Sequence, residues 1–215
     1  MKILVIGATG GSGRAATAEL LRRGHTVTAF SRHASELRLD GDLITFDGDA
    51  TRPGDVASAM AGQEAVVVAL GISESAVRVR LRGAAATASD VRSRGTAVAI
   101  DAARAAGVSR FIVQSSYGVG PTRRLLGATD RMIFALLLKP QIADTEKQEQ
   151  AVRASGLEWT LVQPVHLTDG PDAEPTVTTG RAPGATKVSR LSVARVLADA
   201  AEGQHGEGQT LSVSG

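Results

Sequence analysis

The sequence predicts an α/β fold in which a doubly wound parallel sheet carries a small C-terminal cap. Three observations predict it. An aliphatic run leads directly into a cluster of glycines, apolar runs of strand length alternate with helical segments along the chain, and 43% of the 215 residues are apolar, enough for one buried core. We therefore expect a single domain over residues 1–215, to which residues 166–215 add a small elaboration.

The first element is a strand that ends in a glycine-rich turn. Residues 3–6 read Ile-Leu-Val-Ile, an unbroken aliphatic run that is typical of a central parallel strand covered on both faces. Glycines follow at Gly7, Gly10 and Gly13. They suit a tight turn, a close approach of the backbone to a pyrophosphate, and close packing of the next helix on the strand.

The residues around these glycines predict a dinucleotide site. Ser12 can add a hydroxyl donor, and the free N–H groups at the start of a helix provide an anion site. Helical spacing continues over residues 15–23, Gly24 can end that helix, and a second strand over residues 26–30 completes a β-α-β unit. A strand-to-helix turn that binds no ligand is the alternative.

The end of the second strand indicates which dinucleotide binds. Sites that prefer NAD place an acidic residue there, about 20 residues beyond the glycines, to hold the ribose hydroxyls. This sequence instead reads Phe30-Ser31-Arg32-His33, and the guanidinium of Arg32 can bind a 2′-phosphate and stack on adenine. We therefore predict NADP(H) as the cofactor. The alternative is a solvated loop charge that nearby Glu36 partly neutralises.

Further strands and helices alternate along the chain. The expected strands are residues 43–46, 65–70, 111–114 and 157–163. The expected helices are residues 53–60, a segment that runs from a cap at Ser89 or Ser93 to Gly107, residues 129–138, and residues 144–154. Pro53 opens the first of these helices, and Pro140 separates the last two.

The segment after His166 is expected to contain shorter elements than the rest of the chain. We expect short extended pieces at residues 176–179 and 186–188, a helix at 192–201 and a last strand at 210–213, which together form the cap beside the substrate end of the crevice. Ligands of a doubly wound sheet bind outside the carboxyl ends of its strands. One crevice is therefore expected to collect Gly7 to Gly13, Arg32, Asp49, Gly71, Ser115, Ser116 and Pro164 to His166.

Composition excludes several classes of site and partner. The absence of cysteine excludes disulfides and thiolate chemistry, and four scattered histidines make a metal site unexpected. No apolar run approaches the roughly 20 residues of a membrane span, so we expect a soluble, cytoplasmic protein. A net charge of +2 and 3% aromatic residues give no indication of a nucleic-acid partner.

One segment is locally basic. Five arginines, Arg78, Arg80, Arg82, Arg92 and Arg94, fall between Gly71 and Ala97. The cluster is either a solvated loop and helix face or an attraction for a phosphorylated substrate or cofactor such as FMN.

On these motifs the chain resembles the atypical short-chain dehydrogenase/reductases and, among them, the flavin reductase and biliverdin-IXβ reductase-like proteins. The resemblance covers nearly the whole chain. It is carried by Gly-Ala-Thr-Gly at 7–10, Ser-Arg at 31–32, Gly-Asp-Ala at 48–50, Leu-Gly at 70–71, Ser-Ser at 115–116, Ser-Gly-Leu-Glu-Trp at 155–159 and Gln-Pro-Val-His at 163–166.

The resemblance implies a Rossmann fold and roles for particular residues. Asp49 and Ala50 would contact adenine, Ser116 would be the catalytic candidate beside the nicotinamide, and Pro164 to His166 would border the carboxamide. The alternatives are a turn residue at Asp49, strand-end hydrogen bonding by the serines, and a plain loop residue at His166. The predicted cofactor contacts are Gly7, Thr9, Gly10, Gly11, Ser12, Gly13, Arg32, Asp49, Ala50, Leu70, Gly71, Ser115, Pro164, Val165 and His166.

The chain departs from the short-chain carbonyl reductases at the proton donor. Those enzymes use a tyrosine four residues before a lysine. Here the residue four positions after the single tyrosine, Tyr117, is Pro121, and the residue four positions before Lys147 is Ala143. Reduction of an ordinary ketone would lack its general acid, a loss of order 10²–10⁴ in rate. Oxidised flavins and quinones accept hydride at a low barrier and can take their proton from water.

Two further positions leave the substrate open. The reductase family commonly has an arginine where this sequence has Ser73, which puts a biliverdin-type substrate or tightly bound FMN in doubt. Lys147 is either a substrate or ribose contact or an exposed charge paired along its helix.

The sequence thus favours an NADPH-dependent reductase that transfers hydride to a flavin, a quinone or a similar conjugated small molecule, as a monomer or homodimer. The alternative is a non-catalytic NADP(H)-sensing regulator that resembles the NmrA-like proteins, which keep the glycine turn but lack the tyrosine and lysine pair. An epimerase of nucleotide-linked sugars is disfavoured, because such enzymes use the same tyrosine and a longer substrate domain.

Overall fold

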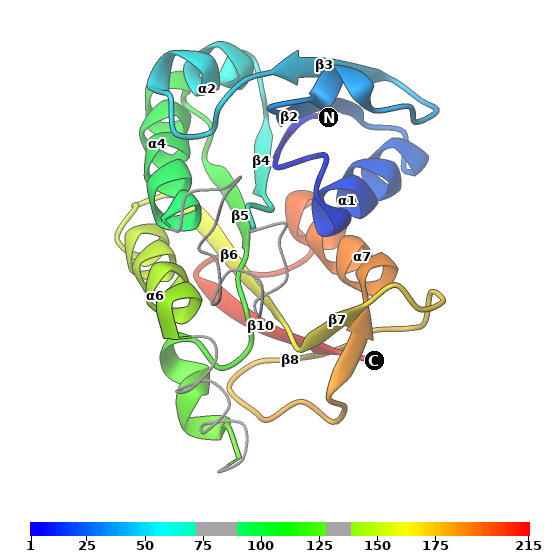
Figure 1. Ribbon diagram of the computed structural model, residues 1–215, viewed down its shortest axis with the longest axis vertical. Coiled ribbons are helices and arrows are strands. Elements are labelled where there is room, and N and C mark those ends of the chain that lie inside the picture. Colours follow the sequence, from blue (N-terminus) through cyan, green and yellow to red (C-terminus); the bar gives the residue numbers. More distant parts are fainter. Residues whose placement is uncertain (72–89, 128–138) are drawn as a thin grey trace.

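The computed structural model describes residues 1–71, 90–127 and 139–215. Within these ranges eight strands form one sheet in the order β3-β2-β1-β4-β5-β6-β10-β8, and Figure 1 shows this sheet between two groups of helices. Neighbouring strands are parallel, except that β8 runs antiparallel to β10. The prediction of a doubly wound parallel sheet is therefore confirmed.

The element bounds are as follows. The strands of the large sheet are β1 (Lys2–Ile6), β2 (Thr26–Ser31), β3 (Leu43–Asp47), β4 (Ala65–Val68), β5 (Arg110–Gln114), β6 (Glu158–Pro164), β8 (Thr176–Thr178) and β10 (Gln209–Ser214). A separate parallel pair consists of β7 (His166–Thr168) and β9 (Lys187–Ser189). The helices are α1 (Gly11–Arg22), α2 (Pro53–Met60), α4 (Val91–Ala106), α6 (Lys139–Arg153) and α7 (Arg190–Ala201), with 3₁₀ turns η1 (Ala34–Glu36) and η2 (Gly120–Leu125).

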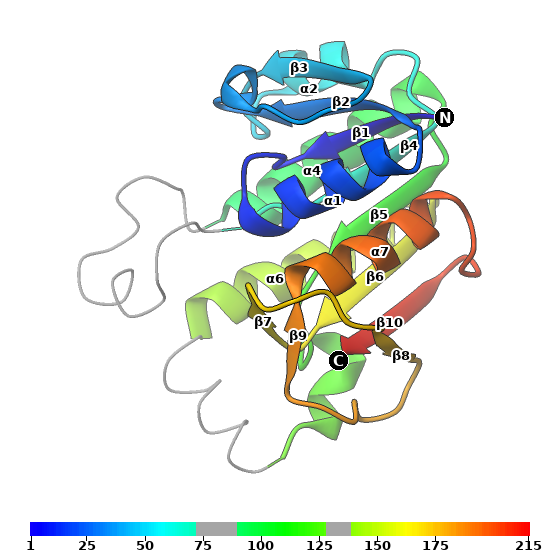
Figure 2. The same ribbon diagram turned by 90° about the vertical axis from the view of Figure 1, so that its right-hand side faces the viewer.

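Helices α2, α4 and α6 cover one face of the sheet, and α1 and α7 cover the other (Figures 1 and 2). Because the inner strands are covered on both faces, they read as continuous apolar runs; all four residues of β4 are buried. In the described ranges, no helix is both long and apolar enough to cross a membrane.

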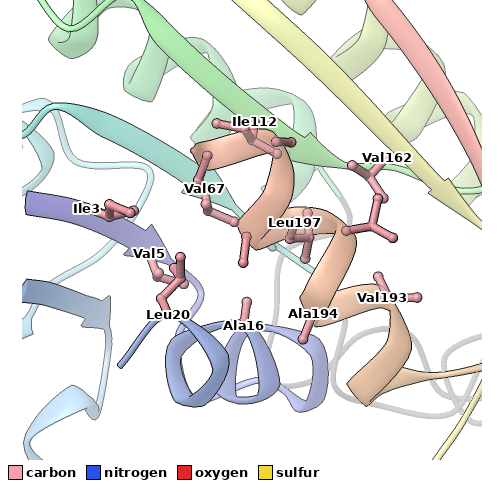
Figure 3. Close-up of a cluster of buried hydrophobic side chains, with 14 of the residues drawn as sticks. Ile3, Val5, Ala16, Leu20, Val67, Ile112, Val162, Val193, Ala194 and Leu197 are labelled. Atoms are coloured by element: carbon pink, nitrogen blue, oxygen red, sulfur yellow. The ribbon is translucent and has the colours of Figure 1, made fainter. Parts of the chain in front are cut away.

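The α1 and α7 face holds one of two hydrophobic clusters. Figure 3 shows Leu20 of α1 and Leu197 of α7 among strand residues such as Val5, all of them buried. Small buried side chains at Ala16 and Ala194 belong to the same cluster. Small residues at a helix contact allow the helix axes to approach closely, so α1 and α7 pack against each other as well as against the sheet.

Two element boundaries near the glycine turn differ from the predicted ones. Helix α1 begins at Gly11 rather than at residue 15, because the extended residue Gly10 already serves as its N-cap. Strand β4 ends at Val68 rather than at residue 70. Ala69 and Leu70 leave the sheet and border the cleft described below.

The predicted cap of α4 is wrong. Its N-cap residue is Asp90, and Ser93 lies inside the first turn, while Ser89 lies outside the described residues. The helix is capped instead by the carboxylate of Asp144, on α6. This carboxylate accepts hydrogen bonds from the backbone N–H groups of Arg92 (3.1 Å) and Ser93 (3.2 Å) and from the Ser93 hydroxyl (2.5 Å). Gly107 ends the helix with a positive φ of 71°, as predicted.

Helix α6 begins earlier than predicted. In the described residues it starts at Lys139, so Pro140 lies in its first turn. A proline is tolerated there because first-turn N–H groups have no partner within the helix. The helix predicted over residues 129–138 lies outside the described residues.

The C-terminal residues form a smaller cap than expected, because most of them complete the sheet. Strand β10 pairs with β6, β8 pairs with β10, and α7 packs on α1. From His166 on, the described residues that border the crevice are His166 and Leu167 of β7, four residues between 182 and 186, and Arg190 at the start of α7. Figure 2 shows the β7 and β9 pair at the end of the molecule away from β3.

An arginine joins α1 to α7. Arg23 donates hydrogen bonds to Glu19 of its own helix (2.8 Å), to Asp199 of α7 (2.7 Å) and to Glu202 (2.9 Å). Burial by itself lowers the pKa of Arg23, but the hydrogen bonds to Glu19 and Asp199 and the charge of Glu202 outweigh it, so the pKa rises above its usual value. The charged form of Arg23 therefore stabilises the contact between the two helices.

We expect Arg23→Ala to lower the free energy of unfolding by about 2 kcal/mol, because it removes charge-assisted hydrogen bonds that cross between helices. Urea unfolding followed by circular dichroism would measure this. The matched control is Arg22→Ala, which removes an arginine that binds the same Glu19 but has a side chain 69% exposed. It should cost less than about 0.5 kcal/mol. Equal losses in the two variants would contradict the assignment.

Candidate functional site

The glycines in the turn between β1 and α1 differ in how much space surrounds them. A side-chain carbon at Gly7, where φ is +90°, would lie 2.6 Å from the carbonyl oxygen of Ala69, and one at Gly13 would lie 2.1 Å from that of Gly7. Both glycines are therefore required by the fold itself. At Gly10 the nearest atom would be 3.4 Å away, an ordinary contact. The space above Gly10 is open to a ligand.

Helix α1 starts without a side-chain cap. Its N-cap is Gly10, so within the described residues no side chain accepts a hydrogen bond from the first-turn N–H groups. The first backbone bond of the helix runs from the N–H of Arg14 to the carbonyl of Gly10 (2.7 Å). Uncapped N–H groups and the positive end of the helix dipole suit an anion such as a pyrophosphate.

A cleft of about 600 Å³ extends from this turn across the ends of β2, β3 and β4. It brings together predicted residues that are far apart in the sequence. They are Gly7, Thr9, Gly10, Gly11, Ser12, Arg32, Asp49, Ala50, Leu70 and Gly71. Gly13 is buried behind the turn and does not border the cleft.

At the β3 end of the cleft, Asp49 is held in a turn. Its Oδ1 accepts hydrogen bonds from the backbone N–H (2.9 Å) and the hydroxyl (2.8 Å) of Thr51. These bonds, with smaller contributions from the charges of Arg52 and Arg32, hold the pKa of Asp49 below its usual value. Asp49 is thus an ionised turn residue beside Arg32 that also borders the cleft, and its contact with adenine stays a prediction.

A second cavity of about 480 Å³ adjoins the cleft. It contains the remaining predicted residues, Ser115, Ser116, Pro164, Val165 and His166, together with Tyr117. Four residues border both cavities: Leu70, Arg92, Gln114 and Leu167. The cleft and the second cavity are therefore parts of one continuous site along the carboxyl ends of the strands.

The two serines after β5 have different environments. The hydroxyl of Ser115 donates a hydrogen bond of 2.5 Å to Glu149 Oε1 on α6, which also accepts one of 2.6 Å from Gln163 Nε2. Glu149 is buried, and Arg153 lies 3.2 Å from its other oxygen. Ser115 is thus engaged in packing β5 and β6 against α6. The hydroxyl of Ser116 makes no hydrogen bond to another described residue and is open to the second cavity.

Lys147 does not belong to the site. It is exposed on α6 and borders neither cavity. Tyr117 does border the second cavity, but no lysine lies beside it among the described residues of that cavity. The structure therefore favours the exposed-charge interpretation of Lys147. Ser73, Arg78, Arg80 and Arg82 lie outside the described residues.

Sequence reasoning missed Arg190. It is the first residue of α7, where it borders the cleft. A side-chain carbon at Gly11 would lie 2.8 Å from its Nε, and Arg190 Nη1 donates a 2.5 Å hydrogen bond to the exposed Asp169. No local motif marks this arginine, because only the packing of α7 on α1 brings it to the glycine turn.

The chain belongs to the NAD(P)H-binding family, whose pattern matches residues 7–204. It is 34% identical over 125 residues to a 3-beta-hydroxysteroid dehydrogenase of Mycolicibacterium neoaurum, covering 55% of this chain and 32% of the relative. It is also 34% identical over 115 residues to a 3-diazoavenalumate denitrifying reductase of a Streptomyces species, covering 54% and 38%. The matched part thus spans about a third of these relatives' length.

Solved structures share the fold. The anaerobillin reductase ChuY of Escherichia coli O157:H7 superposes with a TM-score of 0.78 at 23% identity, over 99% of this chain and 96% of that one. At this identity the likeness shows the Rossmann-like fold alone.

The two kinds of glycine lead to a prediction. Gly10→Ala should fold with a change in stability within about 1 kcal/mol, yet bind NADPH about 10-fold or more weakly, because the new methyl group occupies the space above the turn. Gly13→Ala should lose about 1–3 kcal/mol of stability through overpacking. Thermal melting and fluorescence titration with NADPH measure both effects. Unchanged affinity in Gly10→Ala would mean that the pyrophosphate binds elsewhere.

Proposed function

We propose that this protein is an NADPH-dependent reductase that transfers hydride to a flavin, a quinone or a similar conjugated acceptor. The observation that carries the proposal is the continuity of the two cavities. The first has a dinucleotide-type glycine turn at one end and Arg32 at the other, and the second opens beside Ser116 with Lys147 outside it.

The residues of the cleft fit a phosphorylated dinucleotide. The open space above Gly10 and the uncapped start of α1 suit the pyrophosphate, and Arg32 suits a 2′-phosphate. NADPH bound in this way would supply the hydride. Leu70 and Leu167 lie where the two cavities meet and would keep water from the reacting atoms.

The second cavity suits a conjugated ring. Its lining includes Leu125, Leu126, Pro164 and Val165, an apolar surface on which a planar acceptor can lie. A tyrosine activated by a neighbouring lysine is what an ordinary ketone would need, and Lys147 is not in a position to provide it. An acceptor that requires only orientation is therefore favoured. The two curated relatives, a dehydrogenase and a reductase, support redox chemistry in general.

Steady-state oxidation of NADPH with riboflavin, FMN, quinones and simple aldehydes tests the proposal. We expect turnover with flavins or quinones and little with aldehydes. Tight NADPH binding without turnover of any acceptor would instead indicate a cofactor-sensing regulator, the alternative that the missing tyrosine and lysine pair also allows.

The cofactor preference gives a second prediction. Arg32→Ala should weaken NADPH binding by about 10- to 150-fold, since charge-assisted hydrogen bonds contribute about 1.5–3 kcal/mol, and should leave NADH binding nearly unchanged. Arg52→Ala, which removes an exposed arginine outside the cleft, is the matched control. Fluorescence titration measures both affinities. Equal losses for the two cofactors, or a wild-type preference for NADH, would exclude a 2′-phosphate contact.

For Arg190, unlike Arg32, we predict equal losses of affinity for the two cofactors. Arg190→Gln should weaken NADPH and NADH by the same factor, about 10-fold, because a pyrophosphate contact is common to both cofactors. Asp169→Asn is the control, since it releases Arg190 from its ion pair and should leave affinity unchanged or higher. If Arg190→Gln weakened the binding of NADPH alone, Arg190 would instead bind the 2′-phosphate.

The last prediction concerns the residues after β5. Tyr117→Phe should lower turnover of a flavin or quinone by less than about 10-fold, whereas Ser116→Ala should lower it more, because its unengaged hydroxyl can orient the nicotinamide or the acceptor. Measurements of kcat across pH would check this. A loss of about 10³-fold in Tyr117→Phe, with a shifted pH profile, would identify Tyr117 as a general acid and favour ketone substrates.

A further inference from the structure

Arg92 lies where the cleft meets the second cavity. It is at the start of α4, and it borders both cavities together with Leu70, Gln114 and Leu167. These four residues define the junction between the cavities. Among the described residues that line the second cavity, Arg92 is the only arginine or lysine, and none is an aspartate or a glutamate. The junction therefore carries one permanent charge, and that charge is positive.

Hydrogen bonds hold the Arg92 guanidinium in place. Its Nε donates one to the carbonyl oxygen of Leu70 (3.2 Å), and its Nη1 donates one to Thr145 Oγ1 (3.2 Å). Its Nη2 would lie 3.6 Å from a side-chain carbon placed on Gly71, a residue of the cleft. Burial lowers the pKa of Arg92 and the charge of Asp144 raises it, but a guanidinium remains protonated in proteins.

The carboxylate of Asp144 does not shield this charge from the junction. Asp144 accepts hydrogen bonds from the backbone N–H of Arg92 and from the N–H and hydroxyl of Ser93, and it borders neither cavity. Among residues 1–71, 90–127 and 141–215, no carboxylate oxygen lies within 4.0 Å of the Arg92 guanidinium. A ligand at the junction therefore meets the guanidinium first.

The proposed orientation of the cofactor brings its ring to the junction. Arg32 suits the 2′-phosphate of the adenosine half, and the open space above Gly10 suits the pyrophosphate. Hydride can pass only if the nicotinamide ring meets the acceptor in the second cavity. The nicotinamide half therefore extends from Gly10 toward the junction, where Arg92 lies.

The two redox states of that ring differ by one charge. The oxidised nicotinamide ring is a cation, whereas the dihydronicotinamide ring is neutral. Like charges repel, and the repulsion is screened less in a partly buried site than in bulk water. A fixed guanidinium at the junction therefore disfavours the oxidised ring and has no such effect on the reduced ring.

We propose that Arg92 makes the site select the reduced cofactor over the oxidised one. The selection rests on the cofactor site of the proposed function and is independent of the acceptor. Once the hydride has left, repulsion between Arg92 and the oxidised ring speeds the release of NADP⁺, so that the next NADPH can bind. In a protein that reduces nothing, the same residue would make binding depend on the ratio of NADPH to NADP⁺.

The other charged side chains of the cleft act elsewhere on the cofactor. Arg32 and Asp49 lie toward the β3 end, where the adenosine half is expected. Arg190 lies beside Gly11 and is paired with Asp169 at 2.5 Å. The adenosine and pyrophosphate groups carry the same charge in NADPH and NADP⁺. Contacts with these groups therefore change both affinities by the same factor.

The first test compares Arg92→Gln with Arg94→Gln. The control removes the same formal charge from an exposed arginine of the same helix that borders neither cavity. Calorimetric titration should show that the wild type and Arg94→Gln bind NADPH about 10-fold or more tightly than NADP⁺. In Arg92→Gln the ratio should fall about 5-fold, chiefly because NADP⁺ binds more tightly. Equal ratios in the two variants would overturn the role of Arg92.

Two further variants separate charge from shape and ring from phosphate. Arg92→Lys keeps the charge and should keep most of the preference for NADPH. Arg32→Ala should weaken NADPH and NADP⁺ by the same factor and leave their ratio unchanged. The pair NADH and NAD⁺ should show the same response to Arg92→Gln, because its ring is identical. A response confined to the phosphorylated pair would mean that Arg92 binds the 2′-phosphate instead.

The wild-type protein provides a test that needs no variant. 2′-Phospho-ADP-ribose contains the same phosphates as NADP⁺ but lacks the ring. We expect it to bind more tightly than NADP⁺ and more weakly than NADPH, because a neutral ring adds contacts whereas a cationic ring adds repulsion. Should Arg92→Gln fail to fold, this series decides the proposal: equal affinities for NADPH and NADP⁺ would overturn it.

Failure of this inference can be distinguished from failure of the proposed function. If the wild type reduces a quinone but binds NADPH and NADP⁺ equally, the reductase function stands and the selection by Arg92 is wrong. If it prefers NADPH, loses that preference in Arg92→Gln and reduces no acceptor, the selection stands and the reductase function is wrong. If it binds no dinucleotide, both are wrong.

Discussion

The structure depends on how closely helix α1 packs against the end of strand β1. At Gly13 and at Gly7 there is no room for even one side-chain carbon, so backbone meets backbone where β1 ends, α1 begins and β4 ends. This contact aims the uncapped first turn of α1 at the gap between β1 and β4. That gap is where the order of the strands reverses, and a doubly wound sheet opens its ligand crevice there. The location of the cleft thus follows from one backbone contact.

The opposite side of the cleft is built from the C-terminal end of the chain. Helix α7 covers the same face of the sheet as α1, and Arg23 joins the two helices through carboxylates on both. This packing sets Arg190, the first residue of α7, against Gly11. Residues expected to form a separate cap therefore help to shape the site, because the sheet needs cover on both faces.

Helix α6 organises the wall of the second cavity. Two of its buried carboxylates accept hydrogen bonds from other elements: Asp144 caps α4, and Glu149 holds Ser115 after β5 and Gln163 in β6. Buried carboxylates are costly unless they are well satisfied, so these bonds fix α4, β5 and β6 relative to one another. With Ser115 held, its neighbours Gln114 and Ser116 are presented to the cavity.

The sequence by itself predicted the sheet and the glycine turn, and it singled out Arg32, which the structure places at the cleft. Ile3 to Ile6, the glycines and Arg32 could be assigned because strand burial and a tight turn impose local requirements on neighbouring residues. Only the tertiary structure decided that Asp144 caps α4, that Lys147 lies outside the site and that Arg92, Gln114 and Arg190 border it. These facts depend on contacts between segments far apart in the chain. No periodicity or spacing in one segment specifies which distant side chain it will meet.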